Sequence, residues 1–210
     1  KKPEAMAKVD KTYTDTIIRQ VGDIGRLVDE FSSFARMPVP VIRSEELRDV
    51  CNHALFLERN THPEIEYVLT APEGRFVAPC DARQLGQALI NLLRNAAASI
   101  LEPPADEAEA APRKPGRIEV RLEREGAMAS IAVLDNGKGL PVDLLPRLTE
   151  PYVTTRARGT GLGLAIARKI MEDHGGELRM ENRPDGGARV ALIWPAAAME
   201  SSVARGEAAE

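Results

Sequence analysis

Apolar residues recur at helical spacing in four segments of the chain, and short runs of strand-forming residues lie between the last three segments and after the last one. The first helical segment covers residues 5–36, and the Pro-containing residues 37–40 end it. Its apolar positions are Ile17, Val21, Ile24, Val28, Phe31 and Phe34. These steps of four and three residues form a coiled-coil seam, and a lone amphipathic helix is marginal in water. The pattern therefore predicts a helical hairpin or homodimer in preference to packing on its own domain.

The pattern after this break predicts an α+β domain over residues 41–195. Helices are expected from an N-cap at Ser44 to residue 57, from an N-cap at Asp81 to residue 100, and over residues 163–174. Strands are expected at residues 65–69 and 75–78, around a turn at 72–74, and at 118–122, 130–134, 177–181 and 189–193. This count predicts a two-layer α/β sandwich, in which about three helices cover one face of a mixed sheet.

The composition argues against several classes of protein but does not indicate an activity. Of 210 residues, 43% are hydrophobic and 29% charged, and the formal net charge of −4 gives no basic footprint for nucleic acid. No apolar run approaches the roughly 18–20 residues that span a bilayer. Cys51 and Cys80 lack metal-ligand spacing, which favours reduced thiols. The chain starts without Met, so we expect it to be a piece of a longer protein, ending in a flexible tail at residues 196–210.

Glycines alternate with other residues over positions 159–163, directly before the last predicted helix. Without Cβ atoms, consecutive N–H groups can turn around an anion. A phosphate in this loop would also lie at a helix N-terminus, where unpaired N–H groups favour negative charge. Glycine-rich turns before helices are common, so the run points to a phosphate site only together with two other segments.

Two amides, Asn91 and Asn95, stand one turn apart in the helix predicted after Asp81, so both lie on one face. Asn is unfavourable inside a helix because its side chain competes for backbone hydrogen bonds. For either residue alone, a solvated or locally bonded amide is the simpler interpretation. As a pair they indicate oxygen ligands for a Mg²⁺ that bridges nucleotide phosphates.

An acidic residue, Asp135, ends the strand predicted at residues 130–134 and is followed by Asn-Gly-Lys-Gly. A carboxylate at a strand end, beside glycines that allow close approach, can accept a hydrogen bond from an exocyclic amine. In isolation the segment would read as an ordinary Asn-Gly turn. A flexible, Ala/Pro/Glu-rich stretch at residues 102–116 is expected to form a mobile loop without a direct chemical role.

These segments together resemble the ATP-binding domain of sensor histidine kinases, of the fold shared with gyrase, the Hsp90 chaperone and MutL. Residues 91–99 are similar to the N box, 135–139 to the G1 box, 150–155 to the F box and 159–164 to the G2 box. Residues 31–38 and the compact N box resemble most the nitrogen-regulation kinases of the NtrY type. The resemblance implies an ATP-dependent protein-histidine kinase with Mg²⁺ as cofactor.

The resemblance also assigns roles to residues. Asn95 would be the Mg²⁺ ligand with Asn91 beside the phosphates, and Asp135 would bind the adenine amine. Residues 140–158 would form an ATP lid. Ala98 stands where the family usually has Lys or Arg, so the positive charge at the phosphates would come from Lys138, Arg156 or Arg158. The full set expected at the nucleotide is Asn91, Asn95, Asp135, Gly137, Lys138, Gly139, Leu140, Thr155, Arg156, Arg158, Gly159, Thr160, Gly161, Leu162 and Gly163.

The resemblance further suggests a mechanism. In the hydrolytic relatives a Glu acts as general base where Asn91 stands here, and an amide cannot take a proton near neutral pH. The site would hold ATP until a His imidazole attacks the γ-phosphorus, and the phosphoryl group would pass to an Asp of a response-regulator receiver domain. The alternatives are a gyrase- or chaperone-type ATPase and a non-catalytic nucleotide-binding dimer scaffold.

The phosphoacceptor His of such kinases lies on the first helix of a two-helix hairpin. His53, His62 and His174 do not stand in that context. Residues 1–38 are therefore expected to be the second hairpin helix, with the first helix outside this chain, so the chain alone should not phosphorylate itself. Membrane attachment, on the cytoplasmic face of a bacterial inner membrane, would come only from upstream segments.

Overall fold

The computed structural model describes residues 14, 17–18, 21–22, 24–25, 28, 31–32, 35–102, 115–156 and 159–196. The described positions between 14 and 32 are helical and exposed, and they include the apolar Ile17, Val21, Ile24 and Val28. The long N-terminal helix and its dimer seam otherwise lie outside the described residues and stay predictions. The loop at residues 103–114 and the tail at residues 197–210 also lie outside them.

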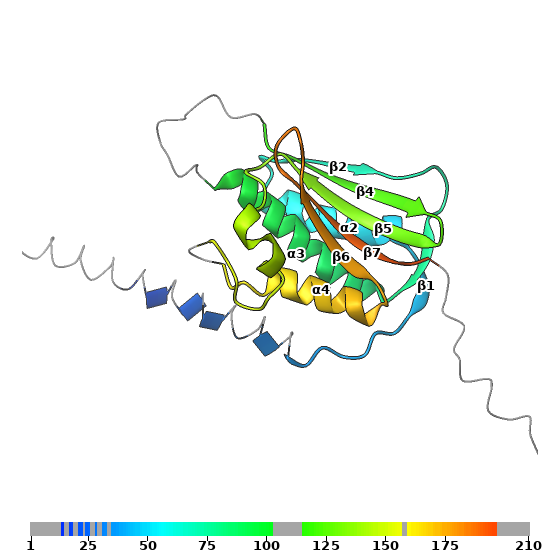
Figure 1. Ribbon diagram of the computed structural model, residues 1–210, viewed down its shortest axis with the longest axis horizontal. Coiled ribbons are helices and arrows are strands. Elements are labelled where there is room, and N and C mark those ends of the chain that lie inside the picture. Colours follow the sequence, from blue (N-terminus) through cyan, green and yellow to red (C-terminus); the bar gives the residue numbers. More distant parts are fainter. Residues whose placement is uncertain are drawn as a thin grey trace, which may run out of the picture.

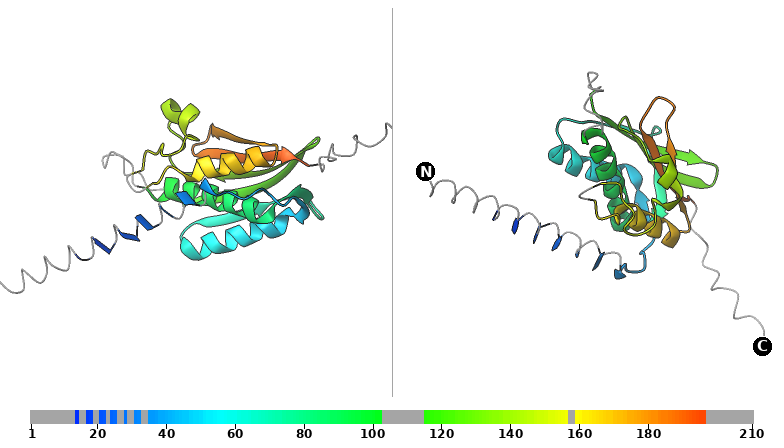
Figure 2. Two further views of the ribbon diagram at one scale, coloured as in Figure 1. Left: turned by 90° about the horizontal axis from the view of Figure 1, so that it is seen from below. Right: turned by 60° about the vertical axis from the view of Figure 1, so that its left-hand side comes forward.

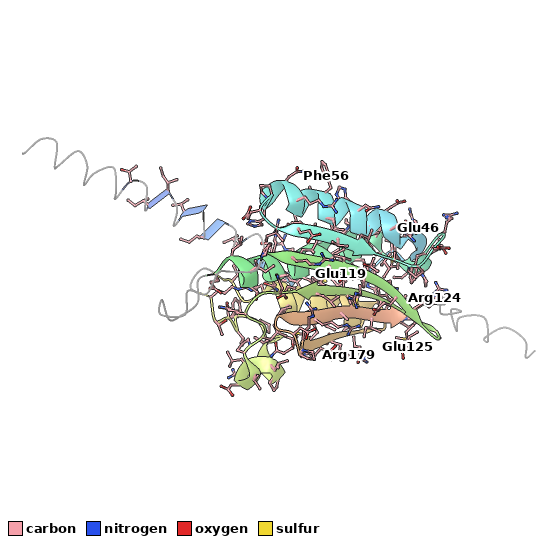
Figure 3. All side chains as sticks on the ribbon, turned by 90° about the horizontal axis from the view of Figure 1, so that it is seen from above. Glu46, Phe56, Glu119, Arg124, Glu125 and Arg179 are labelled. Carbon is pink, nitrogen blue, oxygen red and sulfur yellow. The ribbon has the colours of Figure 1, made fainter. Side chains whose placement is uncertain are left out.

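A five-stranded mixed sheet forms one layer of the domain (Figure 1). Its strands, in spatial order, are β2 (Glu66–Thr70), β4 (Arg117–Glu125), β5 (Met128–Asp135), β7 (Ala188–Pro195) and β6 (Glu177–Asn182). Only β2 and β4 are parallel, and the other neighbours pair antiparallel. Along β4 the apolar Ile118, Val120 and Leu122 are buried, whereas Glu119 between them, labelled in Figure 3, lies on the other face.

Three helices, α2 (Leu47–Thr61), α3 (Ala82–Leu101) and α4 (Gly163–Asp173), form the second layer, with α3 between the other two (Figure 2). Their apolar faces meet the sheet in one core. That core includes Leu89, Leu93, Ile131, Ile166 and Trp194. The α+β sandwich predicted from the hydrophobic pattern is confirmed. Among the described residues, no helix combines the length and hydrophobicity that crossing a membrane requires.

Two local predictions were wrong at the start of the domain. Ser44 is not an N-cap but lies in strand β1 (Arg43–Glu46), which pairs antiparallel with β3 (Val77–Cys80) in a separate two-stranded sheet. The N-cap of α2 is Glu46 (Figure 3), whose carboxylate accepts hydrogen bonds from the N–H groups of Arg48 and Phe76. The strands expected on either side of a turn at residues 72–74 also do not pair with each other, because β2 pairs with β4 and β3 with β1.

The N-cap predicted at Asp81 is confirmed, and this residue also holds the segment before the domain. Its Oδ1 accepts from the N–H groups of Arg83 and Gln84, and its Oδ2 accepts from Val41 N at 3.0 Å. The Asp81 N–H donates to Nε2 of His174, the C-cap of α4, at 3.0 Å. The preceding segment and the two helices α3 and α4 therefore meet at one corner.

Candidate nucleotide-binding site

The two amides of α3 lie on one face of the helix, as their spacing predicted, and that face meets the start of α4. Asn91 Nδ2 donates to the carbonyl oxygen of Gly163, the first residue of α4, at 3.3 Å. A Cβ on Gly163 would lie 3.8 Å from both Asn91 Cβ and Asn95 Nδ2, so the absence of a side chain there leaves room around both amides. The boundary between α3 and α4 thus carries two polar groups in an otherwise apolar contact.

The side-chain oxygen of Asn95 accepts a hydrogen bond from a cation. Arg156 Nη1 donates to Asn95 Oδ1 at 2.9 Å, and Arg156 Nη2 donates to the main-chain oxygen of the same residue at 2.7 Å. Burial lowers the pKa of Arg156 below its usual value, although the carboxylates of Glu102 and Asp135 oppose this shift. An oxygen that already faces a positive charge is a chemically suitable ligand for a hard metal ion.

Asp135 ends β5 and is almost fully buried. Its Oδ1 accepts from the N–H groups of Gly137 at 2.8 Å and Ala188 at 3.4 Å. Burial raises the pKa of Asp135 above its usual value in spite of these hydrogen bonds and the nearby Arg183. None of the described hydrogen bonds reaches Oδ2, which is left to accept from a ligand.

The turn at Asp135 is fixed by parts of the chain that the sequence analysis did not assign to the site. Arg183 Nη1 donates to the main-chain oxygen of Asp135 at 2.7 Å, and a Cβ on Gly187 would lie only 2.0 Å from that oxygen. Asn182 Oδ1 accepts from the N–H of Leu140 at 2.7 Å, and Asn182 Nδ2 donates to the main-chain oxygen of Leu140 at 2.9 Å. The β6–β7 hairpin therefore supports both the carboxylate and the start of the segment predicted to form the lid.

The glycine run packs directly against the backbone of the predicted F-box segment. Tyr152 N–H donates to the carbonyl oxygen of Gly161 at 3.1 Å. Gly161 has φ +69°, and a Cβ there would lie 2.6 Å from Tyr152 C. Tyr152 itself, with φ +67°, is the sole non-glycine residue with positive φ among the described residues. Strain of this kind persists where surrounding contacts impose it.

We expect Gly161→Ala to destabilise the protein more than the same change at Gly175. Both glycines have φ +69°, but a Cβ on Gly175 meets nothing within 4 Å, whereas one on Gly161 meets the backbone of Tyr152 and Val153. Gly175→Ala should lower the free energy of unfolding by about 1 kcal/mol, and Gly161→Ala by roughly 2–4 kcal/mol. Urea denaturation of both variants measures the difference, and equal losses would contradict the close packing.

Most of the residues predicted to contact the nucleotide line one cavity of about 240 Å³. Those that line it are Asn91, Asn95, Asp135, Lys138, Gly139, Leu140, Thr155, Arg156, Gly159, Thr160, Gly161 and Gly163. Gly137 lies beside the cavity, where a Cβ would lie 2.7 Å from the main-chain carbon of Ser99. The side chain of Leu162 is buried in the core, and Arg158 lies outside the described residues.

The cavity offers a metal ion neutral amide oxygens as ligands, and not a cluster of ionisable side chains. Within the part of the chain that the structure describes, no group of three or more His, Cys, Asp or Glu could hold a metal ion. The Lys138 ammonium is paired with the Glu102 carboxylate at the end of α3. A metal bound here would take Asn95 Oδ1, with further oxygens from water and a phosphorylated ligand.

A family model described as "Histidine kinase-, DNA gyrase B-, and HSP90-like ATPase" matches residues 80–198, more than half of the chain. The chain belongs to this family. The matched residues span α3, β5, the glycine run and the β6–β7 hairpin, which are the elements that surround the cavity. The prediction of an ATP-binding domain of the sensor histidine kinase type is confirmed.

Curated relatives place the ATPase-family domain among sensor kinases. It is 51% identical over 184 residues to the nitrogen regulation protein NtrY of Azorhizobium caulinodans, covering 87% of this chain and 23% of that protein. It is 31% identical over 180 residues to the sensor histidine kinase ZraS of Escherichia coli K12, covering 84% of this chain and 36% of that protein. The chain thus spans about a quarter to a third of the length of these relatives and is similar to their ATP-binding catalytic portion.

Solved structures of histidine kinases share the fold. The mycobacterial sensor histidine kinase MprB is 27% identical, with a TM-score of 0.62 over 76% of this chain and 100% of that chain. The histidine kinase ThkA, in its complex with the response regulator TrrA, is 23% identical, with a TM-score of 0.68 over 88% of this chain and 51% of that chain. At that identity the second comparison shows the fold alone.

Proposed function

We propose that this domain binds ATP with Mg²⁺ and transfers the γ-phosphoryl group to a His on a helix outside the chain. From there the group would pass to an Asp of a response-regulator receiver domain, in nitrogen-related signalling. The observation that carries the proposal is the meeting of the α3 amides, Asp135 and the glycine run at one cavity. The similarity to NtrY supports the signalling context.

The residues around the cavity suit a nucleotide with its base at Asp135 and its phosphates at α4. Asp135 Oδ2 would accept a hydrogen bond from the exocyclic amine of adenine. The N–H groups of residues 161–163 would donate to the phosphates at the start of α4, where the helix dipole favours negative charge. Asn95 would hold Mg²⁺, which supplies charge neutralisation at the phosphates.

The amide at position 91 favours transfer to an incoming nucleophile over hydrolysis. Asn91 lines the cavity and its Nδ2 donates to Gly163 O, and an amide cannot accept a proton from water near neutral pH. A neutral imidazole nitrogen would supply its lone pair for the new P–N bond. The bond from phosphorus to the bridging oxygen would break, and ADP would leave with the electron pair of that P–O bond. The imidazole N–H proton is then lost to solvent.

Further parts of the whole protein are proposed from the relatives and the sequence. Residues 1–38, with their apolar seam, would form the second helix of a dimerisation hairpin, and the tail at residues 196–210 would be flexible. The first hairpin helix and any attachment to the inner membrane would lie in other segments of the longer protein, with this domain on the cytoplasmic side. A dimer through the seam brings two catalytic domains near one hairpin pair.

A transfer assay separates the proposed kinase from an ATPase and from a nucleotide-binding scaffold. The chain is mixed with [γ-³²P]ATP, Mg²⁺ and a separate His-bearing hairpin from an NtrY-type protein. We expect acid-labile label on the hairpin, none on this chain, and little free phosphate. Release of free phosphate at a comparable rate without labelled hairpin would favour the ATPase, and neither product would favour the scaffold.

A further inference from the structure

The guanidinium of Arg156 connects the lid to the residue that is proposed to bind the metal. It makes two hydrogen bonds to Asn95, one to the side-chain oxygen at 2.9 Å and one to the main-chain oxygen at 2.7 Å. Both acceptors are neutral, and the guanidinium lines the nucleotide cavity. Two parallel donors on one residue fix the position of the side chain more strongly than a single contact.

The backbone around Arg156 is held in place on both sides. Its N–H donates to Thr154 Oγ1 at 3.1 Å, and its carbonyl oxygen accepts from Gly159 N at 3.1 Å. Tyr152 is in turn bonded to Gly161, next to the start of α4. These hydrogen bonds hold the backbone of Arg156 within its segment, so rotation of the long side chain alone is enough to move the guanidinium away from Asn95.

A guanidinium and a magnesium ion cannot share Asn95 Oδ1 at low energy. The amide has one side-chain oxygen, and a monovalent and a divalent cation bound to it would repel strongly inside a partly desolvated cavity. We propose that Arg156 is a built-in competitor of Mg²⁺ at Asn95, so that arrival of the metal–nucleotide complex releases Arg156 from α3. This inference rests on the proposed function, because it requires Asn95 to be the metal ligand.

Release gives Arg156 a second role. The freed guanidinium lies on the lid beside the phosphate end of the cavity, and it can then bond to phosphate oxygens. The lid therefore responds to the metal and the nucleotide together, because only the complex supplies both the cation that replaces Arg156 and the anion that receives it. Metal-free nucleotide would leave the bonds to Asn95 in place.

The test is a magnesium titration of Arg156→Met, which keeps a long side chain and removes the donors and the charge. Binding of fluorescent N-methylanthraniloyl-ADP is followed because ADP lacks the γ-phosphate that Arg156 could contact. Removing the competitor should lower the half-saturating Mg²⁺ concentration by about threefold or more. Arg147→Met is the matched control, since it removes the same charge from an exposed lid residue paired with Glu150, and it should leave that concentration unchanged.

A second readout follows the Asn95 amide directly. The side-chain NH₂ resonances of Asn95 in NMR spectra should move in Arg156→Met without metal, and Mg²⁺ with ADP should move them in the unmodified protein. An unchanged or higher half-saturating concentration in Arg156→Met, with metal-dependent binding intact in the unmodified protein, would overturn this inference alone. Absence of any Mg²⁺-dependent binding in the unmodified protein would overturn the proposed function as well.

Discussion

Replacing Asn95 with alanine is expected to abolish magnesium-dependent nucleotide binding. Even residues behind a metal ligand typically contribute 10- to 100-fold to metal affinity, so loss of the ligand itself should weaken Mg²⁺-dependent ATP binding at least about 100-fold. Asn95 is half-buried at the cavity, and among the described residues its side chain bonds Arg156 and no core group, so the fold should survive the change. Calorimetric titration with a non-hydrolysable ATP analogue, with and without EDTA, measures the effect.

Asn95→Asp is the matched variant for this experiment. A carboxylate retains an oxygen ligand for Mg²⁺ at the same place, so magnesium-dependent binding should return to within about tenfold of the unmodified protein. In EDTA the alanine variant should bind nucleotide about as weakly as the unmodified protein. Unchanged magnesium dependence in Asn95→Ala would rule out this residue as the metal ligand.

Replacing Asp135 with asparagine is expected to reverse the preference of the site for the base. In the structure Oδ1 is held by the N–H groups of Gly137 and Ala188, so an asparagine would keep its oxygen there and turn its NH₂ group to the ligand. That group would face the adenine amine, donor against donor. ATP affinity should fall about 100-fold, which is the order of a hydrogen bond to a charged group.

Inosine triphosphate provides the matched test of Asp135→Asn. Its 6-oxo group is an acceptor that the new NH₂ group can bond, so the variant should prefer inosine triphosphate to ATP. The thermal midpoint should change little, because both main-chain hydrogen bonds to the side-chain oxygen remain. Equal losses of affinity for both nucleotides would place the base away from Asp135.

ATP binding should depend on pH in the unmodified protein in a way that it does not in Asp135→Asn. Burial raises the pKa of Asp135 above its usual value, so the carboxylate begins to take up a proton at a higher pH than an ordinary Asp. The protonated group is a poorer acceptor for the adenine amine. The ATP affinity of the unmodified protein should therefore weaken as pH falls through that pKa. Its advantage in ATP affinity over Asp135→Asn should become smaller.

Local pattern was enough to predict the parts of the site that stand close in sequence. The spacing of Asn91 and Asn95 places them on one helix face. The alternating glycines at 159–163 predict a helix N-terminus whose N–H groups are not covered by side chains. The α+β layers followed from the alternation of buried and exposed residues, as along β4. These features depend on helix and strand periodicity, which each segment carries by itself.

Contacts between distant segments could not be read from the same pattern. β1 forms only because β3, more than 30 residues later, pairs with it, so Ser44 was mistaken for a helix cap. Arg183 and Gly187 reach the Asp135 turn because β7 pairs with β5, and nothing in their own segment indicates a site. The bond from Arg156 to Asn95 likewise depends on how the segment before the glycine run packs against α3.

One nucleotide is expected to occupy the cavity between α3, α4 and the end of β5. A crystal structure of this chain with Mg²⁺ and a non-hydrolysable ATP analogue would show its position. We expect Mg²⁺ on Asn95 Oδ1, the adenine amine on Asp135, phosphates at the start of α4, and Arg156 released from Asn95. A nucleotide bound elsewhere, or a metal held without Asn95, would contradict the account.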